Sequence, residues 1–250
     1  MTVLDVYKRQ LLIDDPVRSE EELADYRRVG GVSLLDAQPG GAGRNAAILK
    51  EISIQSGISV ITVTGYHLPH FYPANHWLLT ENIDEQCNRF RHELSEGCVE
   101  APEVRPGAVK AALGPEGCAG RLKDCFQAAA MAAGEADVPL IVHTEKGAGA
   151  VEAVRLARAV GVPAHRVVIC HADRQATDYA PHDAIADTGA MLEYDTIGRF
   201  KYHDDDSEVR LIRHMIERGH AHQLLISLDT TRERLKRYGK QTSLSFNQSL

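Results

Sequence analysis

Four residues that could take part in metal chemistry lie at or near the ends of apolar, β-branched segments: Lys110, His143, His171 and Asp229. Neutral imidazole suits zinc and similar divalent ions. A carboxylate such as that of Asp229 can ligate the same ion and take a proton from the water that the ion activates. The four residue types therefore predict a metal site with hydrolytic chemistry, provided that the fold brings them together.

Two members of this set leave alternatives open. A lysine ammonium has no lone pair for a metal, so Lys110 fits only if carbon dioxide carbamylates its amine and turns it into a bridging carboxylate. A histidine at a strand end is also a common hydrogen-bonded core residue, so from spacing alone His143 and His171 fit metal binding and a structural role about equally well. If His171 faces the barrel interior, strand alternation directs Cys170 toward the helices.

The elements that must position these residues alternate along the chain. Short apolar runs predict strands over Ser33 to Asp36, Val60 to Thr64, Val104 to Leu113, Pro139 to Thr144, Arg166 to His171, Ala190 to Tyr194 and Gln223 to Asp229. Helical patterns cover Ser19 to Arg28, with a capping box of Ser19 and Glu22, and Glu81 to Leu94, Leu122 to Ala133, Val151 to Val160 and Glu208 to Arg218. This alternation predicts a parallel α/β barrel of the (β/α)8 type that is incomplete, because one strand is missing.

A doubly wound open sheet is the rival architecture. Its best support is Gly40-Gly41-Ala42-Gly43, which follows a predicted strand and opens a helix. The G-x-G-x-x-G spacing of a dinucleotide site is not met. A glycine turn before a helix that starts near Arg44 is the preferred interpretation.

Composition and charge narrow the function classes. The chain has 250 residues, 44% hydrophobic and 25% charged residues, and a net charge of -7. These values are ordinary for a soluble globular protein, and an acidic balance without a dense Lys/Arg run argues against nucleic-acid binding. No apolar run predicts a membrane span or a signal peptide, so we expect a cytoplasmic location. Five cysteines without a C-x-x-C pair fit reduced thiols.

Taken together, four segments resemble the phosphotriesterase-like family of the amidohydrolase superfamily. They are Gly107-Ala108-Val109-Lys110, Val138 to Thr144, Val168 to Asp173 and Leu225 to Asp229. The resemblance implies a (β/α)8 barrel with a binuclear divalent metal centre, commonly zinc. It further implies that carbamylated Lys110 is the bridging ligand, that His143 and His171 hold the more exposed metal, and that Asp229 is both a ligand and the catalytic proton acceptor for a metal-bound hydroxide.

The chain departs from the family pattern at its beginning. The family's first strand carries His-x-His before a segment like Leu11-Leu12-Ile13-Asp14, whereas Lys8-Arg9-Gln10 stands at that place here. We interpret residues 1–10 as a non-native segment and residues 11–250 as a single truncated hydrolase barrel. The stretch from Gln241 to Leu250 is more polar and shorter than the closing helix of the family, which points to an incomplete C-terminus.

Residues on the predicted catalytic loops bear on the substrate. Lys201 and Arg232 follow the last two strands, where barrels often bind phosphate, and Tyr66 and His67 follow an earlier strand and could line the pocket. The pattern resembles the family branch that hydrolyses phosphorylated sugar lactones, although both cations equally fit solvated loop charges. We expect five further histidines on the surface: His182, His203, His214, His220 and His222. Asp204-Asp205-Asp206 lacks the EF-hand spacing and fits a loop that caps the next helix.

The sequence favours a metal-dependent hydrolase of a lactone or phosphorylated sugar lactone. We expect a small-molecule substrate, and the sequence is compatible with a homo-oligomer. A phosphotriesterase or phosphoester hydrolase is the alternative reaction. A catalytically impaired barrel fragment that lacks the His-x-His motif, acting only as a binding protein, is the alternative from another class. A nicotinamide-dependent oxidoreductase is the most distant interpretation.

Overall fold

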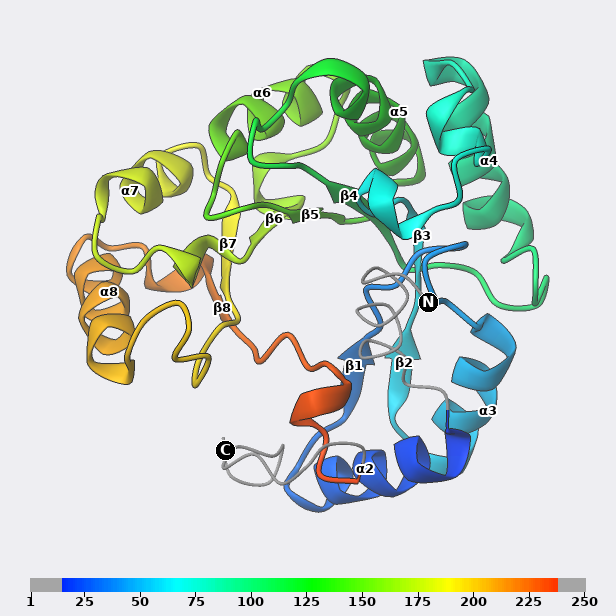
Figure 1. The fold of residues 1–250 in the computed structure, drawn as a ribbon, viewed down its shortest axis with the longest axis horizontal. Coiled ribbons are helices and arrows are strands. Elements are labelled where there is room, and N and C mark those ends of the chain that lie inside the picture. Colours follow the sequence, from blue (N-terminus) through cyan, green and yellow to red (C-terminus); the bar gives the residue numbers. More distant parts are fainter. Residues whose placement is uncertain (1–14, 238–250) are drawn as a thin grey trace.

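The computed structural model describes residues 15–237, in which strands line the inside of a curved wall and helices cover the outside (Figure 1). The predicted first-strand region up to Asp14 and the polar stretch from Gln241 lie outside the described residues. Within the described part of the chain, no helix combines the length and apolar character needed to cross a membrane.

The strands are short, parallel and ordered as they occur in the chain. They are β1 (Ser33–Leu35), β2 (Ser59–Ile61), β3 (Val63–Gly65), β4 (Ala108–Ala112), β5 (Leu140–His143), β6 (Val167–Cys170), β7 (Met191–Tyr194) and β8 (Leu224–Ile226). β1 pairs with β2, and β3 to β8 form one sheet in sequential order. Every segment predicted as a strand contains one, and the predicted strand from Val60 to Thr64 is split into β2 and β3 at Thr62.

Sequential strand order distinguishes the two architectures considered from the sequence. A doubly wound sheet reverses its strand order at a switch point, and this sheet does not. The chain therefore has the parallel α/β fold of the TIM-barrel type. Among residues 15–237, no strand pairing joins β8 to β1, so hydrogen bonds between the described strands do not close the ring.

The helices form the outer layer. They are α2 (Pro16–Arg28), α3 (Ala46–Ser56), α4 (Ile83–Glu96), α5 (Gly120–Ala136), α6 (Ala150–Ala159), α7 (Ala180–Ala186) and α8 (Asp205–Glu217). The predicted capping box of Ser19 and Glu22 is wrong, because α2 begins one turn earlier, with Asp15 as its N-cap and Pro16 in its first turn. A capping box is present instead at α4, between Asn82 and Glu85.

The glycine-rich segment is a turn, as preferred. It leads into α3, whose N-cap is Asn45. Arg44, next to this cap, is buried and pairs with Glu93 on α4 and with Glu100, and its guanidinium also donates to the carbonyl of Val63 on β3 at 2.9 Å. Arg44 therefore ties the turn to the edge of β3 and to the helix layer.

Two apolar layers lie on the two sides of the sheet. The large outer core joins the strands to the helices and includes alanines of α5, Val142 of β5 and Ile169 of β6. A smaller inner cluster joins Val63, Ala108, Ile141 and Cys170 across β3 to β6. Cys170 thus faces the interior rather than the helices, which corrects the sequence-based expectation.

Candidate active site

Lys110 lies on the interior side of the sheet. It is 4% exposed and stands in register with Gly65 of β3 and Ile141 of β5. A Cβ at Gly65 would lie 1.9 Å from the Lys110 carbonyl oxygen, and Gly65 has φ +106°, so only glycine fits this close approach. After burial, the positive charge of Lys110 contributes to lowering the pKa of His143 and of His171.

His143 ends β5 with its ring held by a carboxylate. Its Nε2 lies 3.2 Å from Oε1 of Glu145, and the other oxygen of Glu145 accepts from Arg174 at 3.1 Å. Burial is the main cause that lowers the pKa of His143, although its bond to Glu145 opposes the shift. His143 is therefore a neutral imidazole near pH 7, and no hydrogen bond among the described residues occupies its Nδ1.

His171 reaches the same place by a different backbone route. It has φ 63°, the left-handed region that a non-glycine residue rarely adopts. Its Nδ1 lies 2.9 Å from Oδ1 of Asp195, and its backbone N–H donates to Oδ2 of the same residue at 3.3 Å. Burial lowers the pKa of His171 well below its usual value, with further contributions from His143 and Arg174. Because of this left-handed turn, the side chains of Cys170 and His171 both face the interior.

The structure brings these two histidines together. The ring centroids of His143 and His171 are 4.6 Å apart, with the rings inclined by 74°. His67, which follows β3, lies on the other side of His143 with ring centroids 4.9 Å apart. Burial lowers the pKa of His67 well below its usual value, with His143 and Lys110 adding to the effect. The interior side of the sheet therefore carries two buried imidazoles, the half-buried ring of His67 and the buried Lys110.

Asp229 lies beyond β8 at the edge of this group. Its side chain is about one-third exposed, and its Oδ2 lies 3.0 Å from the Arg199 guanidinium, which also donates to its backbone carbonyl. The charge of Asp229, after burial, helps to raise the pKa of Asp195. Asp229 is thus linked to Asp195, and through it to His171, while Arg199 neutralises it.

The surroundings of His143 and His171 fit those of histidines that bind a divalent metal. Histidine ligands characteristically give their second ring nitrogen to a carboxylate, which fixes the tautomer and orients the ring. Here Glu145 and Asp195 do this for His143 and His171, and the two remaining ring nitrogens have no hydrogen-bond partner among residues 15–237. A cation would also offset the raised pKa of Asp195, because positive charge favours the ionised carboxylate.

Of the predicted pocket residues, His67 and Tyr66 lie on different sides of the sheet. The Nδ1 of His67 accepts from the backbone N–H of Leu68 at 2.7 Å, so Nε2 carries the ring proton. Tyr66 is fully buried in the outer core, and its hydroxyl donates to the carbonyl of Leu122 on α5 at 3.4 Å. The structure thus contradicts the prediction that Tyr66 lines the pocket, because Tyr66 follows the strand on its helix side.

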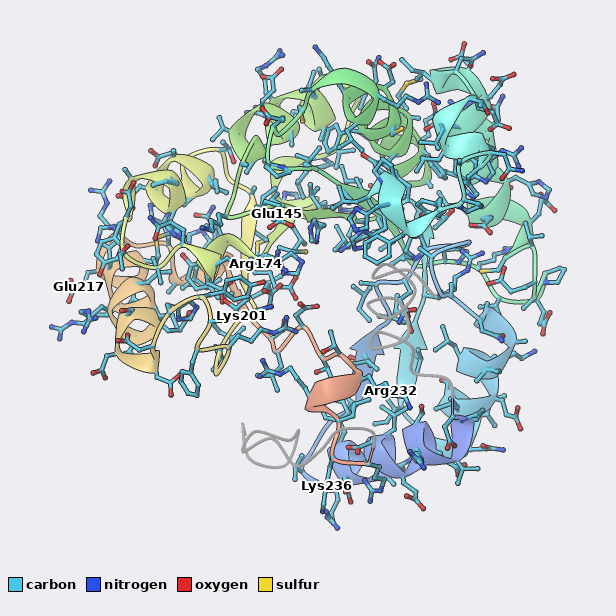
Figure 2. All side chains as sticks on the ribbon, in the orientation of Figure 1. Glu145, Arg174, Lys201, Glu217, Arg232 and Lys236 are labelled. Atoms are coloured by element: carbon cyan, nitrogen blue, oxygen red, sulfur yellow. The ribbon has the colours of Figure 1, made fainter. Side chains whose placement is uncertain are left out.

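The two predicted phosphate contacts are not side by side. Lys201 is exposed, with its ammonium 4.7 Å from the centroid of the Tyr202 ring. Arg232 is half-buried on a short 3₁₀ turn, Arg232–Arg234. Figure 2 places Glu145, Arg174 and Lys201 together beside β6 and β7, with Arg232 across from them near α2. Lys201 and Arg232 therefore approach the site from different sides.

Sequence reasoning missed the residues that surround the two imidazoles. Glu145 follows His143 by two positions, Asp195 directly follows β7, and Arg174 follows His171 by three positions. Their shared signal is a charged residue within three positions of a predicted strand end, which is where a parallel barrel builds its site. Arg174 and Arg199 are also largely buried, and the Nε of each has no hydrogen-bond partner among the described residues.

The expectation of surface positions was wrong for two of the five histidines. His182 is buried, with its ring between the Tyr194 hydroxyl at 2.9 Å and the Gln175 carbonyl at 2.7 Å. The His203 side chain is 3% exposed and lies against two carboxylates. The acidic triplet acts as expected, because Asp204 is the N-cap of α8 and accepts from the Ser207 N–H at 2.7 Å.

Comparison with known proteins identifies the family. The model of the phosphotriesterase family matches residues 16–246. The chain belongs to the phosphotriesterase family. A phosphotriesterase-related protein of Nematostella vectensis is 29% identical over 234 residues, which cover 87% of this chain and 65% of that protein. This chain therefore spans less than two thirds of that relative's length.

Two further family relatives carry more specific names. An N-acetyltaurine hydrolase of Salmo salar is 27% identical, covering 93% of this chain and 69% of that protein. A phospho-furanose lactonase of Mycoplasmopsis synoviae is 26% identical, covering 93% of this chain and 70% of that protein. These relatives are similar to the chain over nearly all of its length.

Solved structures agree on the fold. The phosphotriesterase homology protein of Escherichia coli, crystallised with phosphate in its active site, superposes with a TM-score of 0.86 at 24% identity, covering 94% of this chain and 80% of that chain. The lactonase Lmo2620 of Listeria monocytogenes superposes with a TM-score of 0.88 at 24% identity, covering 96% and 77%. The TIM-barrel type predicted from the sequence is confirmed.

Proposed function

We propose that this family member is a metal-dependent hydrolase that acts on a lactone, and in particular on a phosphorylated sugar lactone. The observation that carries the proposal is the pair of neutral imidazoles, His143 and His171, with rings 4.6 Å apart and a carboxylate on one nitrogen of each. A buried histidine with a purely structural role needs neither a carboxylate on one ring nitrogen nor a second ring nitrogen without a hydrogen bond.

His143, His171 and Asp229 would hold the metal, with Lys110 as a bridging ligand once carbamylated. Imidazole and carboxylate donors favour zinc among the common divalent ions. When bound, such an ion lowers the pKa of water and polarises the substrate carbonyl. Glu145 and Asp195 hold the two rings in place, and the left-handed turn at His171 sets the direction of its Nε2.

The remaining residues of the site bind, orient and move protons. Asp229 lies beyond β8, where its carboxylate, which Arg199 pairs, could accept a proton from the attacking water. His67 presents an Nε2–H toward the interior, where it can donate to a polar oxygen of the substrate. Arg174 lies behind Glu145 and keeps that carboxylate charged and aimed at His143.

An anionic substrate suits the charges at the mouth. The names of two relatives, an N-acetyltaurine hydrolase and a phospho-furanose lactonase, share one substrate pattern: a hydrolysable carbonyl compound that also carries a strong anion. Lys201 and Arg232 are the proposed anion contacts, and Arg199 adds positive charge between the mouth and Asp229. Binding energy from a remote anion can position the carbonyl for attack.

The decisive experiment measures metal content and hydrolysis in the same preparations. Chelator-treated chain is reloaded with Zn²⁺ and assayed on a phosphorylated sugar lactone, the same lactone without phosphate, and a phosphotriester. We expect the phosphorylated lactone to be the best substrate, and His143→Asn to lower the metal retained per chain and to abolish turnover. Preference for the phosphotriester would select the alternative reaction. Metal retention without turnover of any substrate would identify a catalytically impaired barrel.

The anion contacts need their own variants. A charge-assisted hydrogen bond is worth on the order of 1.5–3 kcal/mol, so Arg232→Ala should lower kcat/KM by roughly tenfold or more at about 1.4 kcal/mol per decade. The loss should be confined to the phosphorylated lactone. Lys236→Ala removes an exposed cation from the same region (Figure 2) and serves as the matched control. If Arg232→Ala slows both lactones equally, the anion assignment fails while the hydrolase proposal stands.

A further inference from the structure

A second group of potential ligands lies apart from the imidazole pair. Asp173, His203 and Glu208 each offer one donor atom, and these atoms lie within 4.8 Å of one another. Asp173 follows β6, His203 lies in the loop before α8, and Glu208 lies in the first turn of α8. Their side chains are 0%, 3% and 3% exposed. The group therefore joins three separate segments in a site closed to solvent.

Hydrogen bonds fix which nitrogen of His203 faces the group. Its Nδ1 lies 3.1 Å from the Asp204 carbonyl oxygen, which can only accept, so Nδ1 carries a proton. Its Nε2 lies 3.0 Å from Oε2 of Glu208, 3.0 Å from the Thr196 hydroxyl and 4.0 Å from Oδ2 of Asp173. Nε2 is thus the ring nitrogen that His203 turns toward the two carboxylates.

Donors are in short supply around these acceptors. The single hydroxyl hydrogen of Thr196 goes to Oδ2 of Asp173 at 2.7 Å, beside the Thr196 N–H at 2.6 Å. Oδ1 of Asp173 and Oε1 of Glu208 have no hydrogen-bond partner among the described residues, and Oε2 of Glu208 has only the His203 ring nitrogen beside it. Burial, Asp173 and Asp205 raise the pKa of Glu208 to about 8. A buried set of acceptors without donors calls for a positive species in their midst.

We infer that Asp173, His203 and Glu208 form a buried binding site for a divalent cation, distinct from the proposed catalytic metals. One imidazole and two carboxylates suit Zn²⁺ or Mn²⁺, and two carboxylates balance the charge of one such ion. Bond lengths of about 2.0–2.2 Å require donor atoms a few ångströms apart, as they are here. The Asp204 carbonyl on His203 and the Thr196 donors on Asp173 supply the supporting hydrogen bonds typical of metal ligands.

A cation at this place would have a structural consequence for the mouth of the barrel. Asp173 lies two residues after His171, and the loop from Thr196 to His203 carries Arg199 and Lys201. Cross-linking α8 to the end of β6 would fix that loop against the strand that carries His171. The cation is therefore expected to order the loop and to stabilise the fold without touching the substrate.

The test separates this cation from the catalytic ones. The double variant His143→Asn/His171→Asn removes both imidazoles of the proposed catalytic centre, so metal that it retains belongs elsewhere. After chelation, Zn²⁺ and Mn²⁺ are added separately and bound metal per chain is measured after gel filtration. We expect one ion per chain and, at a hundredfold excess over the dissociation constant, a rise in Tm of about 5–10 °C.

Glu208→Gln in the same background should abolish both effects. Glu217→Gln, an exposed substitution on the same helix (Figure 2), is the matched control and should leave them unchanged. The amide that replaces the Glu208 carboxylate adds a hydrogen-bond donor to a cluster rich in acceptors, so metal-free Glu208→Gln should melt no lower than its metal-free parent. If that variant does not fold, His203 can be tested instead. The visible spectrum of Co²⁺ bound to the double variant should change when His203→Phe is added, because a ligand of the ion is lost.

Two outcomes overturn the inference. If the double variant retains no metal, a proton on Glu208, and not a cation, balances the charge of the three side chains. Equal metal binding by the double variant with and without Glu208→Gln would place the ion at other residues. Neither outcome bears on the proposed hydrolase, because that proposal depends on metal lost from the wild-type chain through His143→Asn.

Discussion

His143 and His171 have ring centroids 4.6 Å apart although they are not partners in the sheet. The register of β5 and β6 pairs His143 with Cys170, so regular alternation would direct His171 to the opposite face. The left-handed backbone at His171 reverses that direction. Two hydrogen bonds to Asp195, from the backbone N–H and from the ring, hold the unfavourable conformation in place.

Asp195→Asn tests this arrangement. The amide keeps a hydrogen-bond acceptor near His171 but removes the negative charge that orients and polarises the ring, so we expect metal affinity or kcat to fall by about 10- to 100-fold. Metal content and turnover of the same preparation are measured together. Asp183→Asn is the matched control, because Asp183 also bonds a histidine, His214 at 3.0 Å, at a partly exposed site away from the imidazole pair. A loss of the same size in both variants would contradict the specific role of Asp195.

His182 makes the stability of the fold depend on pH. Burial lowers its pKa, and its two ring nitrogens are used by the Tyr194 hydroxyl and the Gln175 carbonyl. Below about pH 6.5 the unfolded chain binds a proton that the folded chain excludes, so the contribution of His182 is complete above that pH and is lost as the pH falls. We expect urea unfolding between pH 7.5 and 5 to show a smaller loss of stability in His182→Gln than in the wild type.

Tyr194→Phe examines the same contact at constant pH. It leaves the lone pair of a buried ring nitrogen without a donor, which costs about 1–3 kcal/mol. The free energy of unfolding at pH 8 measures the effect. Tyr179→Phe is the control. The Tyr179 ring stacks against the His214 ring with centroids 4.5 Å apart, so this variant removes a phenol hydroxyl without breaking the bond between Tyr194 and His182, and it should cost much less. Equal costs would show that the His182 contact is not what Tyr194 contributes.

Alternation of apolar strands and amphipathic helices was enough to predict the fold. Each predicted strand was found at its segment because β-branched runs such as Val167–Cys170 fit only a sheet buried on both faces. The boundaries moved where caps decided them: α2 begins at Pro16 because Asp15 caps it, one turn before the predicted Ser19. The strand from Val60 to Thr64 was predicted as one segment, but the neighbour it pairs with changes at Thr62.

The sequence indicated which histidines end strands, but not which side chains surround them. His143 and His171 end strands, which the sequence shows, but the left-handed turn at His171 depends on Asp195, which is distant in sequence. The burial of His182 and His203 depends likewise on tertiary partners. Isolated histidines in helices and loops carry no periodic signal for burial, and assigning both to the surface followed the usual location of polar residues.

We predict that Arg44 stabilises the folded barrel. Its side chain is 1% exposed and joins Glu93, Glu100 and the Val63 carbonyl, so Arg44→Ala leaves buried acceptors without their donor. Removing one partner of such a pair typically costs about 3–5 kcal/mol. Lys50→Ala breaks the exposed pair with Glu103 on the same helix–loop face and should cost less than about 1 kcal/mol. Equilibrium unfolding in urea compares the two, and similar costs would contradict a buried role for Arg44.

Metal occupancy should depend on residues 8–10, which lie outside the described residues. The resemblance drawn from the sequence sets Lys8-Arg9-Gln10 where the family carries His-x-His, and neither ammonium nor amide replaces an imidazole as a zinc ligand. The double variant Lys8→His/Gln10→His should therefore raise the zinc retained per chain and increase lactone hydrolysis, because each added imidazole ligand strengthens metal binding. Arg9→His is the control, because it adds a single imidazole at the middle position of the His-x-His pattern, where the family has no ligand. Zinc per chain after gel filtration and kcat/KM are measured for all three chains. If the double variant retains no more zinc than the wild type while His143→Asn still lowers retention, the ion at His143 is held without a first-strand His-x-His, and the proposed binuclear centre is wrong for this chain.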